Sequence, residues 1–344
     1  MKNALKQAAI IGGLETIAGL RLQRLFPRAG ERGLIFTLHH VRPHQPCAFE
    51  PNGHLEVTPA FLRAVIEESL AAGLTPVRVE DLPALLADPA DRRRFVAFTL
   101  DDGYRNNAVH AAPVFRAFGV PYTIFVTPGF VDRRVSMWWE TAAAVLNAAD
   151  RVEIDLGAGP ERLPAASHAE KVAVFDRICR DVNHGNQQEA TARLNATAAA
   201  LGIDPLGIVD REVMDETELR VLAGGDPLVT YGGHTLTHPV LARIGAEQLA
   251  EEIGQSMAMA GAYLGRPATT FAYPYGTACA VGEREFRAAA AAGVGMAFTT
   301  RPGMLSVRTL EQPMSVRRVS LNGLYQKRRY ISALISGLPF RLKA

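Results

Sequence analysis

Residues 95–103 of the chain have the sequence FVAFTLDDG, in which an apolar run leads directly into two adjacent carboxylates and a glycine. A near-continuous apolar run of this length predicts a strand that is buried on both faces, as in a parallel sheet. In a parallel barrel the carboxyl ends of the strands carry the active site. Asp101 and Asp102 are therefore candidate functional residues, although an aspartate in this position also suits the N-cap of a following helix.

Six further runs of the same kind occur along the chain, at 34–38, 122–126, 228–231, 270–273, 296–299 and 316–321. Helical patterns separate several of them, at 59–72, 107–118, 246–264 and 283–292. This alternation predicts an α/β fold in which helices cover a parallel sheet. Seven strands over this length favour a TIM-like barrel over an open sheet.

The region 132–225 interrupts this alternation. It holds helical patterns at 138–149, 169–182, 188–201 and 217–223, and one short candidate strand at 152–156. Because a loop of this length without structure is implausible inside a compact domain, we predict a helical insertion. It follows the strand at 122–126 and so emerges at the mouth of the barrel. There it either walls a substrate cleft or buttresses the outside.

The composition excludes several classes of protein. With 48% hydrophobic and 21% charged residues in 344, the chain is neither collagen-like, nor disordered, nor a multi-span membrane protein. Its three cysteines are too few for a disulfide framework and suit a reducing, cytoplasmic compartment. A net charge of only +2 argues against a nucleic-acid partner. Residues 8–20 are apolar, but Glu15 interrupts them and no cleavage site follows, so we expect no cleavable signal peptide.

The charge is concentrated at the two ends. Residues 1–33 carry six basic and two acidic side chains, and residues 325–344 carry five basic and none acidic. We therefore divide the chain into a basic amphipathic segment (1–33), the barrel (34–324) and a basic tail (325–344). Helical spacing also places apolar residues on one face of each end: Ile11, Leu14, Ala18, Leu22 and Leu25, then Ile331, Leu334, Ile335 and Leu338.

Such ends suit two arrangements. An amphipathic basic helix binds the surface of an anionic membrane, which would make the protein peripheral at the inner membrane face. Alternatively, both ends pack against the barrel and leave their arginines in solvent.

A second motif, GGHTLTHP at residues 232–239, follows the run at 228–231. His234 and His238 are four residues apart and share one face if the segment forms a helical turn. Neutral imidazoles at this spacing often bind divalent metals, although two solvated histidines are the more common explanation of such a pair. Together with one aspartate of the first motif they complete a two-histidine, one-carboxylate metal site. The other aspartate would remain free to act as a base.

Two more motifs end predicted strands. In TFAYPYG, residues 270–276, backbone N–H groups of the turn could stabilise an oxyanion, or the turn is simply packed aromatic structure. In LHHV, residues 38–41, His39 could deliver a proton to a leaving group, and His40 should point elsewhere.

In this order, LHHV, TLDDG, GGHTLTHPVL and FAYPYG resemble the motifs of the polysaccharide deacetylase superfamily, carbohydrate esterase family four. The resemblance spans residues 34 to 321 and is strongest to the branch that includes poly-N-acetylglucosamine deacetylases. It implies a distorted (β/α)7 barrel. It also implies a hydrolase that removes N-acetyl or O-acetyl groups from an acetylated glycan with a divalent metal, often zinc.

Position by position, the resemblance implies a role for each motif. Asp101 matches the catalytic base that activates a metal-bound water for attack on the acetyl carbonyl. The backbone N–H of Tyr275 matches the oxyanion donor, and His39 matches the general acid. The implied metal ligands are Asp102, His234 and His238.

The chain departs from the pattern of this superfamily at three positions. Ala272 stands where many members have an arginine that orients the base, so this partner is missing or comes from elsewhere. Arg318-Val319-Ser320-Leu321 lacks the histidine of other branches, which leaves the acid role to His39 or vacant. Leu38 replaces a usual tyrosine. These departures keep three alternatives open: a catalytically silent carbohydrate-binding barrel, an O-acetyl esterase, and a peripheral membrane scaffold.

Trp138 and Trp139 open the insertion. Their rings could stack on sugars or pack in the core.

Overall fold

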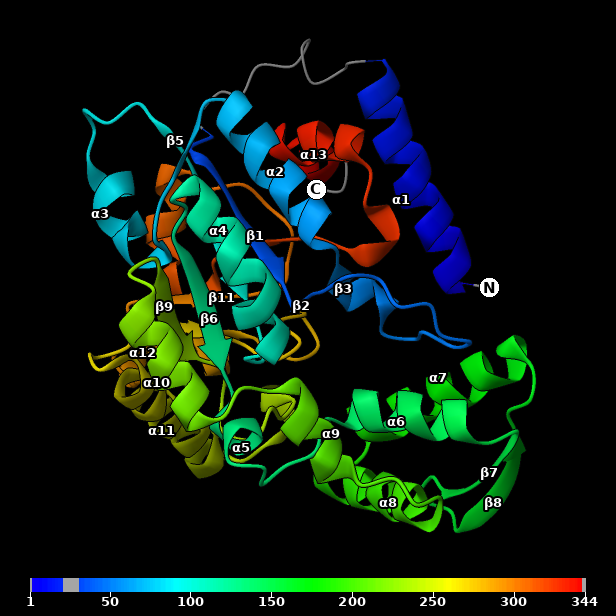
Figure 1. Cartoon of the computed structure of the whole chain (residues 1–344). Helices are drawn as coiled ribbons and strands as arrows, with labels where there is room; N and C mark the ends of the chain where they lie inside the picture. The colour runs from blue at the N-terminus through cyan, green and yellow to red at the C-terminus, as the bar shows by residue number, and fades with distance from the viewer. Residues whose placement is uncertain (1, 21–30, 342–344) are drawn as a thin grey trace.

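The computed structural model describes residues 2–20 and 31–341, and a curled, fully parallel sheet forms its centre (Figure 1). The strands run in the order β11-β10-β9-β6-β5-β1-β12. A further strand, β4, pairs with the first three residues of β5. Their bounds are β1 (Gly33–Leu38), β4 (Leu74–Pro76), β5 (Arg94–Leu100), β6 (Tyr122–Val126), β9 (Val229–Gly233), β10 (Thr270–Ala272), β11 (Met296–Phe298) and β12 (Val319–Ser320).

The residues before and within β12 link the two ends of this sheet. Val316 bridges Phe298 of β11 in parallel and accepts a hydrogen bond from the Thr299 N–H at 2.8 Å. Three residues later, Val319 pairs with Phe36 of β1. One short segment thus contacts β11 with its first half and β1 with its second half. The result is the distorted barrel that the sequence predicts.

Helices cover the outer face of the sheet, as Figure 1 shows. They are α2 (Pro59–Ala71), α3 (Leu82–Ala87), α4 (Ala112–Phe118), α10 (Glu216–Gly225), α11 (Ala246–Leu264) and α12 (Glu283–Ala291). Local sequence sets several of their ends. For example, the Thr58 side chain caps α2 by accepting from the Phe61 N–H, and Gly265 ends α11 in the left-handed conformation. All six residues of β1 are buried, as expected for a strand inside such a barrel.

The insertion is mainly helical and has its own hydrophobic cluster, which includes Val145, Ile178 and Leu194. It contains α6 (Trp138–Ala148), α7 (His168–His184), α8 (Gln187–Ala200) and α9 (Pro205–Glu212), together with the antiparallel hairpin of β7 (Arg151–Asp155) and β8 (Pro160–Pro164). In Figure 1 it lies on the side of the molecule toward which the arrowhead of β6 points, beyond the carboxyl ends of the strands.

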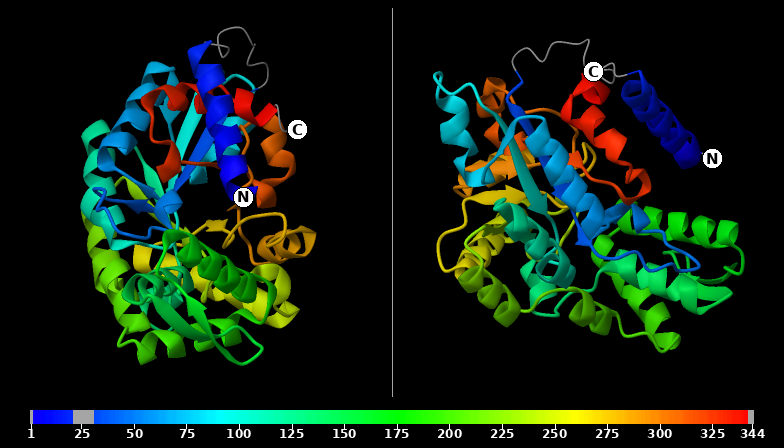
Figure 2. Two further views of the ribbon diagram at one scale, coloured as in Figure 1. Left: turned by 90° about the vertical axis from the view of Figure 1, so that its right-hand side faces the viewer. Right: turned by 45° about the horizontal axis from the view of Figure 1, so that its top comes forward.

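Helix α1 (Lys2–Gly19) lies beside α13 (Arg328–Ile335) and α14 (Leu338–Arg341), so the two ends of the chain meet on one flank (Figures 1 and 2). Leu14 and Ile17 are buried there against Tyr330, Ala333 and Leu338. Part of the apolar faces that the sequence offers to a lipid surface is therefore used between the two ends. The predicted positions Leu22 and Leu25 lie outside the described residues.

Acidic side chains pair with the basic cluster of the C-terminal segment. Glu15 of α1 accepts hydrogen bonds from Lys327, Arg329 and the Tyr330 hydroxyl. Arg328 pairs with Glu67 and Glu68 of α2, at 2.9 and 2.7 Å. Within residues 2–20 and 31–341, no helix has both the length and the apolar character to cross a membrane. Peripheral membrane association stays a prediction.

Candidate metal centre and catalytic residues

The four sequence motifs meet at one mouth of the barrel because each follows the carboxyl end of a parallel strand. Asp101 and Asp102 follow β5, His234 and His238 follow β9, Tyr275 follows β10, and His39 follows β1. His39 is partly buried and interacts electrostatically with both aspartates. The structure therefore brings together all six candidate residues of the sequence analysis.

Asp102, His234 and His238 form the tightest group of these side chains. Asp102 Oδ1 lies 3.5 Å from His234 Nε2 and 3.4 Å from His238 Nε2, and one potential ligand atom from each residue lies within 4.8 Å of the others. All three residues are buried, with exposed fractions of 2, 2 and 7%. Among the described residues, this is the only such group of three.

The hydrogen bonds of this group suit a divalent cation. His234 Nδ1 lies 2.7 Å from the Ala272 carbonyl oxygen, which fixes the ring so that its neutral form carries the proton on Nδ1. Its bare Nε2 then faces Asp102 Oδ1, a buried oxygen that no hydrogen bond satisfies among the described residues. Two electron-rich atoms that face each other in this way need a positive charge between them. The residues present therefore fit a metal ion.

The pKa values of these side chains reflect the same clustering. Burial opposes protonation of His234, but the close contact with the Asp102 carboxylate and the negative charge of Asp101 together outweigh burial and raise the His234 pKa. Burial lowers the His238 pKa to about 4, although the negative charge of Asp102 opposes this shift. His238 thus favours the neutral form that binds metals.

Backbone strain is concentrated in the same motifs. The left-handed region is unfavourable for residues with a side chain. Only five non-glycine residues of the described chain have positive φ, and four of them lie here: Asp102 at 72°, Thr235 at 63°, His238 at 58° and Tyr275 at 62°. Such strained positions persist only where surrounding contacts impose them.

Glu252 of α11 supplies part of this support to the turn between the two histidines. Its buried carboxylate accepts hydrogen bonds from the Leu236 N–H at 2.7 Å, the Thr237 N–H at 3.0 Å and the Thr237 hydroxyl. Glu252 is not among the residues that the sequence motifs single out. Its only local sign in the sequence is a glutamate on the apolar face of a helix.

Arg318 is a second residue that the sequence analysis missed. Its guanidinium, fully buried, donates to both carboxylate oxygens of Asp101, at 2.7 and 2.8 Å. Nε donates to the Thr299 carbonyl and a terminal nitrogen donates to the Thr99 hydroxyl. Burial opposes ionisation of Asp101, but the charge and hydrogen bonds of Arg318, together with the charges of His234 and His39, outweigh burial and lower the Asp101 pKa. Position 272 holds an alanine, and the arginine that pairs with Asp101 in the structure is Arg318, immediately before β12.

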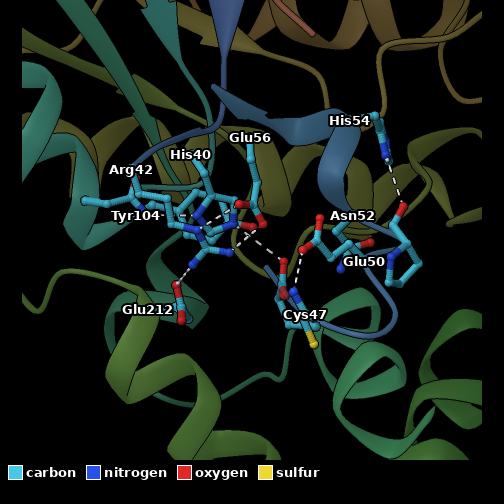
Figure 3. A network of polar contacts seen from close by, with 12 residues as sticks. His40, Arg42, Cys47, Glu50, Asn52, His54, Glu56, Tyr104 and Glu212 are labelled. Carbon is cyan, nitrogen blue, oxygen red and sulfur yellow. Dashed lines mark hydrogen bonds and ion pairs between the residues drawn. The ribbon is translucent and has the colours of Figure 1, made fainter. Parts of the chain in front are cut away.

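The His40 side chain takes part in another polar network, which Figure 3 shows. The Asn106 side chain accepts from the Val41 N–H, so its amide nitrogen faces His40 Nδ1, at 2.7 Å. His40 Nε2 lies 3.5 Å from a Glu140 carboxylate oxygen on α6. In the same network Arg42 pairs with Glu56 and Glu212. This network joins the end of β1 to the insertion.

The insertion also contacts the group formed by Asp102, His234 and His238. The ring of Trp139 lies 5.0 Å from that of His238, and Trp139 Nε1 donates to the Tyr104 hydroxyl. Trp138 Nε1 donates to the Tyr275 hydroxyl at 2.9 Å. Both tryptophans are more than 90% buried, so of the two possibilities offered by the sequence, core packing is the one observed. The insertion forms a wall of the site.

A curled parallel barrel of this kind is also the fold of solved polysaccharide deacetylases. The deacetylase PplD of Streptococcus pyogenes, in complex with acetate, superposes with a TM-score of 0.57 at 14% identity, over 88% of this chain and 97% of that one. IcaB from Ammonifex degensii gives 0.56 at 17% identity, over 89% and 98%. A polysaccharide deacetylase from Bacillus cereus gives 0.56 at 15%, over 89% and 69%. No sequence-family profile and no curated protein matches the chain by sequence.

Proposed function

We propose that the protein is a metal-dependent deacetylase that hydrolyses N-acetyl groups of an amino-sugar polysaccharide or oligosaccharide. The observation that carries the proposal is the arrangement at the mouth of the barrel. A carboxylate kept ionised by a buried arginine, Asp101, lies beside a group of three potential metal ligands. Two neighbouring acids with separate partners can serve two separate roles.

Asp102, His234 and His238 would hold the divalent cation, for which zinc is our first candidate. When bound, such a cation supplies a Lewis acid that polarises the acetyl carbonyl and makes water more acidic. Asp101 is then the base that removes a proton from the attacking water. Arg318 holds both of its oxygens and keeps it ionised, so Asp101 is ready to accept this proton at neutral pH.

The remaining roles belong to Tyr275 and His39. The backbone N–H of Tyr275 would donate to the oxyanion that develops on the acetyl oxygen. His39 would donate a proton to the departing amine, which a nitrogen leaving group needs more than an oxygen leaving group does. Burial lowers the His39 pKa while the charges of Asp102 and Asp101 oppose that effect. A depressed pKa makes the protonated ring a stronger acid, but it also keeps most of the ring neutral at neutral pH, so His39 would have to take up a proton before it could donate one.

The choice of an amide substrate has one further support. A de-N-acetylase from Aggregatibacter actinomycetemcomitans shares the fold with a TM-score of 0.53 at 12% identity. An acetylated glycan is therefore the proposed partner.

The test is acetate release from a panel of N-acetylated and O-acetylated glycans, with and without a chelator. We expect chelator-sensitive release from N-acetylated substrates. Release from O-acetylated substrates alone would identify an esterase. Sugar binding without release would identify a silent binding barrel.

Two variants test the residue assignments. Asp101→Asn should retain bound metal and lose turnover, so full activity in this variant contradicts the assignment of the base. A His234→Ala/His238→Ala double variant should lose the metal. Metal retained at wild-type stoichiometry in the double variant would reject the site.

A further inference from the structure

Gln187, the first residue of α8, links the insertion to two functional turns at once. Its side-chain nitrogen donates to the His238 carbonyl oxygen at 3.1 Å and to the Tyr275 hydroxyl at 3.2 Å. Its side-chain oxygen accepts from the Val240 N–H at 2.8 Å. A single amide from the insertion therefore contacts both the turn that carries a metal ligand and the turn that carries the oxyanion donor.

The position of these hydrogen bonds is informative because the chain between them is Pro239. Proline has no N–H, so this stretch of backbone cannot form a regular ladder with another strand. The Gln187 amide satisfies the carbonyl before the proline and the N–H after it. It therefore fixes the path of the backbone on both sides of a proline, immediately next to a metal ligand.

His238 also needs support from outside its own turn, because its φ of 58° is unfavourable for a residue with a side chain. Within the turn, the Thr235 hydroxyl accepts from the His238 N–H. Glu252 holds Leu236 and Thr237 from α11. Neither contact reaches the carbonyl side of His238, which Gln187 does.

The local sequence presents Gln187 in a defined orientation. Asn186 caps α8 by accepting from the N–H groups of Gln188 and Glu189. Gln188, the next residue, is exposed and has its backbone in that cap. Two glutamines therefore stand side by side at one helix start, and only the first reaches the site.

We propose that Gln187 is a positioning residue that holds His238 and Tyr275 in place, so that the insertion takes part in metal binding and not only in walling the site. This inference rests on the proposed metal function. It adds that a residue in the insertion, about 50 positions before the metal ligand in sequence, sets the geometry of that ligand. Loss of such an outer contact typically lowers metal affinity by about 10- to 100-fold.

The informative variant is Gln187→Met, which keeps the approximate volume of the side chain and removes all three hydrogen bonds. Gln187→Glu retains an acceptor for the Val240 N–H and removes the donors. Gln188→Ala is the matched control. Zinc affinity is measured by competition with a chromophoric chelator, and the visible spectrum of the Co²⁺-substituted protein reports ligand geometry. Thermal unfolding of each metal-free protein checks that it is folded.

We expect the zinc affinity of Gln187→Met to fall by about 10- to 100-fold and its Co²⁺ spectrum to change, with Gln188→Ala like wild type. In acetate release kcat should fall and KM should stay near the wild-type value, because Gln187 supports the reacting groups and not the sugar. If Gln187→Met does not fold, Gln187→Glu carries the same expectation through its lost donors. Wild-type affinity and spectrum in a folded variant overturn the inference.

The outcomes separate this inference from the proposed function. A wild-type protein that binds zinc and releases acetate, with folded Gln187 variants unchanged, refutes only the role of Gln187. A wild-type protein that neither binds zinc nor releases acetate refutes both.

Discussion

Replacement of Arg318 by lysine tests whether the buried guanidinium prepares Asp101 for catalysis. Arg318 donates to four acceptors: both carboxylate oxygens of Asp101, the Thr99 hydroxyl and the Thr299 carbonyl. Lysine keeps the charge but has one nitrogen in place of a planar fork, so it cannot span both oxygens and also reach Thr299. At least one hydrogen bond in which a charged group takes part must be lost.

The size of the effect follows from that loss. A hydrogen bond to a charged group contributes about 1.5–3 kcal/mol. At about 1.4 kcal/mol per factor of ten, this corresponds to about a 10- to 150-fold change if the same contact is needed in the transition state. Arg318→Met would leave the buried carboxylate with no arginine and cost about 3–5 kcal/mol, a large part of the 5–15 kcal/mol that stabilises a domain. Lysine is therefore the more informative change.

The assays are urea unfolding, acetate release under saturating metal, and metal content. We expect Arg318→Lys to lose about 1.5–3 kcal/mol of unfolding free energy and at least about tenfold in kcat/KM, with metal stoichiometry unchanged because no ligand is touched. Arg317→Lys is the control, since the neighbouring side chain is exposed. An Arg318→Lys protein with wild-type stability and wild-type kcat/KM would refute the role assigned to Arg318.

Three further predictions concern stability. Gly232→Ala should destabilise the barrel by about 1–3 kcal/mol, because the new Cβ would lie 2.4 Å from the Phe125 ring. Gly254→Ala in α11 is the control: its Cβ would meet nothing within 4 Å, so it should be neutral or stabilising. Urea unfolding measures both free energies. Glu252→Ala leaves the part-buried N–H groups of Leu236 and Thr237 without their acceptor. It should cost about 1–3 kcal/mol in total and should also weaken zinc binding in chelator competition. Hydrogen bonds from Arg329, Tyr330 and Lys327 hold the Glu15 pKa well below its usual range. The contribution of Glu15 to the attachment of α1 is therefore fully present above the unfolded carboxyl pKa of about 4.3, and it is lost progressively as the pH falls toward the native pKa. Hydrogen-exchange protection of α1 should decrease toward about pH 3 in wild type, whereas in Glu15→Gln it should start lower and change less with pH.

The fold could be predicted to the extent that each element has a local signal. Six of the seven predicted strands are apolar runs that the barrel buries on both faces, and these correspond to β1, β5, β6, β9, β10 and β11. The seventh forms β12 and the bridge at Val316. The strands β4 and β8 escaped prediction for a physical reason. Leu74–Pro76 is three residues long and ends in proline, and Pro160–Pro164 is a largely exposed hairpin strand whose pairing with β7 is a tertiary property.

The same distinction, between features with a local signal in the sequence and features that depend on tertiary contacts, applies to the site. Asp101, Asp102, His234, His238, Tyr275 and His39 could be proposed together because parallel strands bring their carboxyl ends to one mouth. Their supporting residues could not. Arg318 is 217 positions from Asp101, and Gln187 is 51 positions from His238, so only the tertiary structure relates them. One signal was available, since Arg317 and Arg318 lie between apolar residues in the predicted strand at 316–321, where alternation would place one of two neighbours inside.

The closure of the barrel explains why the arginine that pairs with Asp101 can come from the residue just before β12 and not from β10. Ala272 of β10 is fully buried and its carbonyl already holds His234, while β12 lies beside β1, which in turn lies beside β5 and Asp101. The segment that joins β11 to β1 therefore brings Arg318 inside the barrel. There its guanidinium also lies 5.6 Å from the centre of the Phe125 aromatic ring. Asp101 is held by Arg318 of this closing segment. The turn between the two histidines is held by Glu252 of α11, and the carbonyl side of His238 is held by Gln187 of the insertion. Because these three supports come from different parts of the fold, a substitution in the closing segment should impair Asp101 while His234 and His238 keep the contacts that hold them.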